Sequence, residues 1–156
     1  MTGPKSLLLA VTALGLAGAA FAQDANEAAV RSHEARVHHM QLNAFNIAPL
    51  GAMAQGEMPF DAELAASNAS NIAALARLQK NGYWVEGSDS ESLEDSRALP
   101  VIWEDLAEVE THFEELAAAA DATATAAAEG QEAFAAAFGE LGGTCGSCHE
   151  EYREPQ

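Results

Sequence analysis

The chain has 156 residues and a formal net charge of -17, and it is rich in alanine. Its length suits one domain with a sizeable hydrophobic core. A surface this acidic repels nucleic acid and anionic membranes, so we expect neither as a partner. The charge either keeps the protein soluble or favours a basic protein partner.

The first 22 residues have the pattern of a secretory signal peptide. Lys5 precedes an apolar run over residues 7–20, and a small-x-small cleavage pattern ends at Ala22. The run is shorter than the ~20 residues that a membrane-spanning helix requires. We therefore expect export and cleavage after Ala22, which leaves a mature domain of residues 23–156 with 6 basic and 24 acidic residues.

Two helices are expected in the first half of the mature chain. Apolar residues recur at helical spacing over residues 26–53, where Pro49 and Gly51 should bend or end the helix. Asp61 suits the N-cap of a second helix, and Asn81-Gly82 should end it. A polar loop over residues 82–98 follows.

Two further helices are expected in the second half, and Pro100 suits the first turn of the earlier one. Their apolar residues alternate in steps of three and four, which is typical of helices packed nearly parallel or antiparallel. These residues are Ile102, Leu106, Val109, Phe113, Leu116 and Ala120, then Phe134, Phe138, Leu141, Cys145, Cys148 and Tyr152. A turn is expected at residues 121–125. The pattern predicts an all-α fold, an antiparallel up-down-up-down four-helix bundle.

The sequence Cys145-Gly146-Ser147-Cys148-His149 has the spacing of c-type haem attachment. On a helix, Cys145 and Cys148 lie one turn apart on one face, so their thiols can reach the two vinyl groups of one haem. His149 lies on the same side of the helix, where its imidazole can bind the iron as an axial ligand.

Three other interpretations of the two cysteines compete with haem attachment. A thioredoxin-type redox pair requires a βαβ setting, and a zinc site requires further Cys or His ligands at matched spacing. A disulfide within one helical turn would constrain the chain little. Export and the helical setting favour haem. Only seven residues follow His149, so a sixth iron ligand would have to come from an earlier helix.

These motifs resemble the cytochrome c′ family, the class II c-type cytochromes. The resemblance is carried by residues 141–153, by the loop of residues 50–62 and by Pro100-x-Ile102-Trp103. It covers essentially the whole mature chain and implies a four-helix bundle with one covalently attached haem c. It also implies roles for three side chains: Arg36 near the haem propionates, Met40 facing the vacant side of the iron, and Arg153 beside the proximal imidazole.

The resemblance implies two subtypes, which differ in what Met40 does. If Met40 only blocks the distal side, the haem is five-coordinate and high-spin and binds NO and CO. If Met40 binds the iron, the haem is six-coordinate and low-spin, and the protein is an electron carrier. Methionine is compatible with both roles. The residues of the C-terminal motif look more like those of the high-spin members, which favours the five-coordinate form. With Met40 facing the haem, the helical period predicts solvent or interface positions for His38 and His39.

We therefore expect an exported haem protein of a bacterial periplasm that binds NO and CO, with electron transfer as a second role. No acid–base pair or nucleophile constellation stands out in the sequence, so an enzyme is not expected. A redox protein partner is consistent with electron transfer, and the resemblance implies a homodimer paired through the first two helices.

Overall fold

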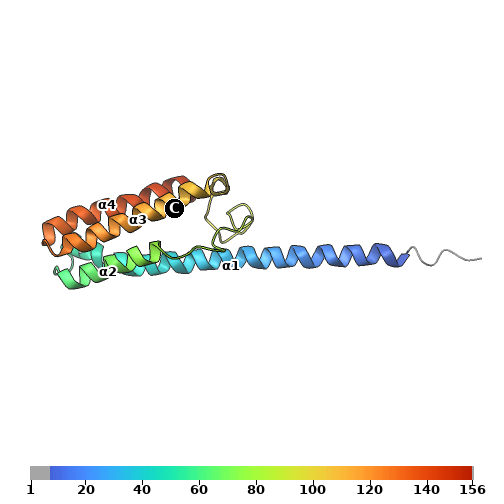
Figure 1. Ribbon diagram of the computed structural model, residues 1–156, viewed down its shortest axis with the longest axis horizontal. Coiled ribbons are helices and arrows are strands. Elements are labelled where there is room, and N and C mark those ends of the chain that lie inside the picture. Colours follow the sequence, from blue (N-terminus) through green and yellow to red (C-terminus); the bar gives the residue numbers. More distant parts are fainter. Residues whose placement is uncertain (1–7, 156) are drawn as a thin grey trace, which may run out of the picture.

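The structure is a computed structural model that describes the backbone of residues 8–155 and the side chains of residues 23–155. It contains four α-helices, α1 (Leu8–Ala54), α2 (Ala62–Ala76), α3 (Leu106–Ala127) and α4 (Gln131–Tyr152), and a short 3-10 helix, η1 (Pro100–Trp103). Helices α3 and α4 lie side by side over α1 and α2, and the N-terminal part of α1 extends beyond the bundle (Figure 1). The predicted all-α, antiparallel four-helix bundle is confirmed.

Residues 1–7 of the expected signal peptide lie outside the described residues. Only the backbone of residues 8–22 is described, as the first part of α1, and cleavage after Ala22 stays a prediction. None of the described helices is long and apolar enough to cross a membrane.

Local signals set the bounds of α1 and α2. Helix α1 continues through Pro49 and ends at Ala54, because a proline removes one backbone hydrogen bond while its neighbours maintain the helix. The Asp61 cap is confirmed, since its carboxylate accepts a hydrogen bond from the Leu64 amide at 3.0 Å. Helix α2 ends at Ala76, earlier than the predicted Asn81-Gly82 stop.

The early end of α2 has a physical cause in Lys80. Its Nζ donates hydrogen bonds to the carbonyls of Ala76 at 2.9 Å and Leu78 at 3.0 Å. These are carbonyl groups that the end of a helix would otherwise leave unpaired. Leu78, which precedes the predicted stop at Asn81-Gly82, therefore lies beyond α2 and is exposed.

Two predictions about the third helix are wrong. The residues from Pro100 form the separate helix η1, and α3 begins after Asp105, whose carboxylate accepts from the Glu108 amide at 3.0 Å. The turn expected at residues 121–125 is helical, because the alanine-rich sequence around it favours continuation of α3 to Ala127. The chain turns instead at Gly130, whose φ is 114° and ψ 173°.

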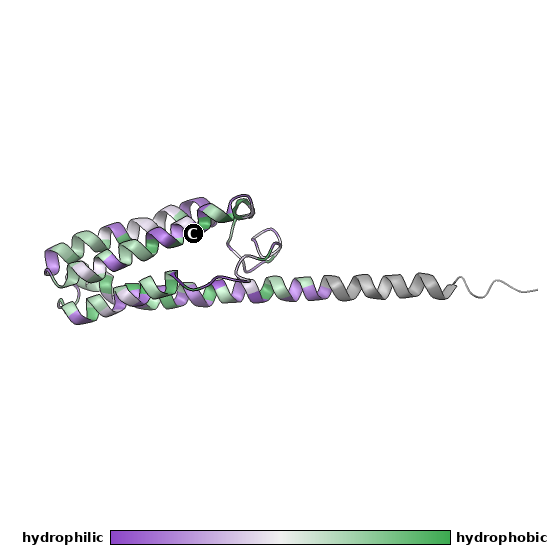
Figure 2. Cartoon of the chain, viewed as in Figure 1, coloured by the Kyte–Doolittle hydropathy of each residue, from purple (hydrophilic) through white to green (hydrophobic). Residues whose placement is uncertain are grey.

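The core consists of two clusters, as the predicted seam requires. One contains larger apolar side chains at the end where α3 joins α4, among them Leu50, Met53, Ile72, Phe134 and Leu141. The other lies toward the end of α4 and contains Ile102, Val109, Phe113 and Tyr152, with Cys148 packed against it. Figure 2 shows hydrophilic and hydrophobic residues alternating along the helices, as expected of amphipathic helices that bury one face.

We expect Gly130→Ala to lower the free energy of unfolding by about 1–3 kcal/mol, because only glycine adopts this backbone conformation without strain. The matched control is Gly139→Ala inside α4, where an added Cβ meets no atom within 4 Å among the described residues. That variant should be more stable than wild type by about 0.5–1 kcal/mol. Urea unfolding followed by circular dichroism measures both changes, and equal effects would contradict the role of Gly130.

Candidate functional site

The predicted Cys-x-x-Cys-His motif lies in the last two turns of α4. Both cysteines are free thiols and are half-buried. Because they are three residues apart on a helix, they share one face. Cys148 packs against the cluster that contains Phe113 and Tyr152, so this face points toward α3.

The surroundings of the thiols do not activate them as a redox pair. Burial raises the pKa of the Cys145 thiol, and burial, helped by the proximity of Cys145 and Glu151, raises the pKa of Cys148 to about 11. Reactive thiols of thioredoxin type have a lowered pKa, because the thiolate is the nucleophile. In the described part of the chain, no group of three or more His, Cys, Asp or Glu side chains is arranged to hold a metal ion.

His149 is in the protonation state that iron ligation requires. Burial, followed by the positive charges of Arg153 and Arg97, lowers the pKa of its imidazole. The ring is therefore neutral at neutral pH and can offer a nitrogen lone pair to a metal. Arg153, predicted to lie beside this imidazole, is close enough for its charge to act on it.

The long loop after α2 is attached to the end of α4 by backbone hydrogen bonds. The Leu99 amide donates to the Tyr152 carbonyl at 2.9 Å, and the Glu154 amide donates to the Arg97 carbonyl at 2.8 Å. Arg97 also donates from Nη2 to the Glu154 carbonyl at 2.6 Å. These contacts fix the loop next to the Cys-x-x-Cys-His motif.

Arg36 joins the same loop to α1. Its guanidinium is 8% exposed and donates to the Ser88 hydroxyl at 2.9 Å, to the Ser88 carbonyl at 2.6 Å and to the Tyr83 carbonyl. It also lies over the Trp84 ring, 5.2 Å from the centroid. Burial lowers the pKa of Arg36, although the nearby Asp89 opposes this effect.

His39 is buried, which contradicts the solvent or interface position expected for it. Its side chain is 3% exposed and packs edge-to-face against Tyr83 and Phe113, with centroids 5.7 and 5.8 Å away. Neither ring nitrogen has a hydrogen-bond partner among the described residues. Burial, together with the charge of Lys80, lowers the pKa of this imidazole. His38 is exposed, as predicted.

Met40 lies at the edge of the buried face of α1. The buried positions of this helix lie three, four or seven residues apart, as expected of one helix face, and they are Ala29, Ser32, Arg36, His39, Asn46, Leu50 and Met53. Met40 is outside this series and is 38% exposed. The sequence signal that could have placed position 39 inside the bundle is the helical spacing back from the apolar Leu50 and Met53, since steps of four, three and four from Leu50 reach position 39.

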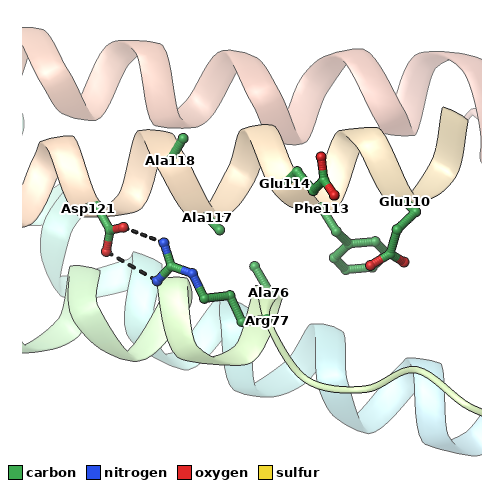
Figure 3. A pocket seen from close by; sticks show the side chains of 8 residues that line it. All are labelled: Ala76, Arg77, Glu110, Phe113, Glu114, Ala117, Ala118 and Asp121. Atoms are coloured by element: carbon green, nitrogen blue, oxygen red, sulfur yellow. Dashed lines mark hydrogen bonds and ion pairs between the residues drawn. The ribbon is translucent and has the colours of Figure 1, made fainter.

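A hollow of about 370 Å³ between α2 and α3 is separate from this site. Figure 3 shows Arg77 reaching across it to pair with Asp121 through both terminal guanidinium nitrogens, Nη1 to Oδ1 at 3.3 Å and Nη2 to Oδ2. Phe113 lines one end of the hollow, and neither the cysteines nor His149 contribute to it. The hollow is open and partly filled by an ion pair, so it does not have the character of a cofactor site.

The residues at this end of the bundle fit a covalently attached haem. Two free thiols and a neutral imidazole provide the attachment and axial groups. Arg36 provides a buried cation that pairs with no carboxylate within the described residues, which suits an anionic propionate. Phe113 connects the two sides, because it contacts His39 and shares a cluster with Cys148.

Comparison with known proteins gives a consistent assignment. The family model described as Cytochrome C' matches residues 31–153. A cytochrome c-554 of Cereibacter sphaeroides is 42% identical over 94% of this chain and 95% of its own, and a cytochrome c′ of the same organism is 35% identical over 96% and 97%. A solved cytochrome c′ structure from Shewanella frigidimarina has a TM-score of 0.71 at 33% identity and covers 81% of this chain and 97% of that chain.

We expect Cys145→Ala with Cys148→Ala to abolish covalent haem attachment, because no thiol remains to form a thioether bond. Each single variant should retain one thioether bond. Haem staining of a denaturing gel and the pyridine haemochrome spectrum distinguish these states. Ser147→Ala, a change at the exposed position between the cysteines, is the control and should behave as wild type. Haem that survives denaturation in the double variant would contradict the assignment.

Proposed function

Because the chain belongs to the cytochrome c′ family, we propose that it is an exported periplasmic protein whose five-coordinate haem binds NO and CO, with electron transfer as a second role. Proteins of this family carry covalently attached haem c, and haem c is the cofactor of this chain. When bound, it supplies an iron that exchanges one electron and accepts an axial ligand.

The side chains around the motif have distinct roles in this proposal. Cys145 and Cys148 attach the haem, and His149 binds the iron through its neutral imidazole. Arg36 pairs with a propionate while its remaining hydrogen bonds hold the loop in place. Arg153 lies beside His149 and favours the neutral form of that imidazole.

The C-terminal motif carries the five-coordinate assignment, because the residues around Cys145, Cys148 and His149 resemble those of the high-spin members of the family. In this form Met40 fills the distal side without binding the iron, a role that the flexible methionine side chain permits. An iron without a methionine ligand has a free position for a small gaseous ligand.

The charge distribution supports a basic redox partner. Among the few basic side chains, those of Arg36 and Lys80 are buried, and that of Arg77 is paired with Asp121. Exposed acidic side chains therefore dominate the surface, in line with the formal net charge of -17. Such a surface steers a positively charged partner toward it at low ionic strength.

Optical and EPR spectra of the haem-loaded protein, before and after addition of CO, test the proposed function. We expect a high-spin ferric haem and ready CO binding by the ferrous form, because no methionine occupies the sixth position. Met40→Leu should leave both properties unchanged. A low-spin wild-type protein that ignores CO, and that Met40→Leu converts to high spin, would instead establish the electron carrier with a His149 and Met40 ligand pair.

We also propose a homodimer formed through α1 and α2. These helices and the residues just after α2 expose several large apolar side chains, and they are Val37, Leu42, Phe45, Leu64 and Leu78. Phe45 is the most exposed of these at 74%, and it borders a shallow hollow that Leu75 and Leu78 line from the side of α2. A self-complementary apolar patch of this kind suits a two-fold symmetric interface.

We expect Phe45→Ser to weaken the dimer by ~2 kcal/mol or more, about thirtyfold in Kd, because a central aromatic side chain commonly dominates an interface. Sedimentation over a range of protein concentrations measures this shift. Val101→Ser removes an exposed apolar side chain from η1, outside the patch, and should leave the dimer intact. An equal effect of the two substitutions would contradict this interface.

A further inference from the structure

The end of the long loop is paired with the residues that follow His149 on α4. Ala98 and Arg153 form an isolated antiparallel bridge. The Glu154 amide donates to the Arg97 carbonyl at 2.8 Å, and the Arg153 amide donates to the His149 carbonyl at 3.2 Å. Backbone hydrogen bonds of this kind hold the two segments side by side. Arg97 is therefore fixed next to the turn of α4 that carries His149.

The side chain of Arg97 is held at this place as well. Its Nη2 donates to the Glu154 carbonyl at 2.6 Å, and the residue is half-buried. Arg97 forms no ion pair with a carboxylate among the described residues. A partly buried charge without a counter-ion is screened less than an exposed one, so it acts more strongly on its surroundings.

The charge of Arg97 reaches His149. Burial is the main cause of the lowered pKa of that imidazole, and the positive charges of Arg153 and Arg97 lower it further. The family resemblance implies Arg153 beside the imidazole, whereas Arg97 belongs to the loop after α2 and was not singled out in the sequence. Two cations from different elements therefore oppose positive charge at His149.

Positive charge on an iron bound to His149 is opposed in the same way. A haem iron gains one unit of positive charge when it passes from the ferrous to the ferric state, and groups around the axial ligand adjust its potential. A cation beside that ligand raises the energy of the ferric state more than that of the ferrous state. The ferrous state is then easier to reach.

We propose that Arg97 is a positioning residue of the haem site, which holds a positive charge beside His149 and so raises the reduction potential of the haem iron. The iron accepts one electron from a redox partner, and no bond forms or breaks at Arg97. From the proposed function this inference requires only the attached haem and its His149 ligand, and it applies to either role of Met40.

Spectroelectrochemical titration of the haem-loaded protein tests the role of Arg97. We expect Arg97→Gln to lower the ferrous-to-ferric ratio at a fixed potential by about threefold to tenfold, where tenfold is 59 mV for one electron. Arg97→Lys keeps the positive charge and should stay close to wild type. Added salt should reduce the difference between wild type and Arg97→Gln, because ions screen the charge. Arg97→Met replaces Arg97→Gln if the glutamine variant fails to fold.

Arg31→Gln is the matched control, since it removes the same charge from an exposed side chain of α1 that pairs with Glu27 at 3.4 Å. This variant should keep the potential of wild type. If Arg97→Gln shifts the potential no more than Arg31→Gln does, the inference is overturned while haem attachment and gas binding stand. Equal shifts in Arg97→Gln and Arg97→Lys would reveal a structural effect instead of one of charge, and would overturn it too.

The proposed function is tested separately in the same samples. The spin state and CO binding of the wild-type protein are recorded before the titration. A low-spin wild type that ignores CO contradicts the five-coordinate function, but its one-electron potential still tests Arg97.

Discussion

The buried guanidinium of Arg36 connects the parts of the molecule that form the haem site. It is hydrogen-bonded to Ser88 and to the Tyr83 carbonyl, so the long loop is fixed against α1. The next residue, Asp89, accepts a hydrogen bond from Trp103 Nε1 at 2.8 Å and so fixes η1 to the loop. The same loop reaches α4 through the Leu99 and Tyr152 backbones. Arg36 and these further hydrogen bonds thus hold the loop together with α1, η1 and α4, which are distant from one another in sequence.

The two core clusters have different roles: one stabilises the bundle, and the other borders the haem site. The cluster around Phe134 and Leu141 is apolar and well buried, and it needs no cofactor to complete it. The cluster around Phe113 borders two buried polar side chains: His39, whose ring nitrogens have no hydrogen-bond partner among the described residues, and Arg36, whose hydrogen bonds go to neutral groups. Unpaired polar groups cost stability, and they are retained where a ligand makes use of them. The haem site therefore lies at the end of the bundle where the packing of the protein side chains does not satisfy every buried polar group.

The sequence predicted the features that depend on local chemistry, including the bundle, its seam and the Asp61 cap. The errors arose where a nearby side chain overrides a general signal: Asp105 starts α3 after Pro100 has formed its own turn, and Lys80 ends α2 before Asn81. The loop contacts of Arg36 join residues about fifty positions apart, such as Ser88, and no local pattern reveals them. The burial of His39 depends on which face of α1 points into the bundle. Neighbouring residues on a helix point about 100° apart, so an error of one position changes which side chain is buried.

The two subtypes of the family differ in what Met40 does. The chain is similar both to a cytochrome c′ and to a cytochrome c-554, so overall similarity does not assign it to one of them. The flexible side chain of methionine can bind an iron or only fill an apolar pocket, so the residue type does not assign it either. A methionine bound to the iron occupies the sixth position and leaves an electron carrier, whereas an unbound one leaves that position to a small ligand. The spin state of the haem iron therefore decides between the two functions.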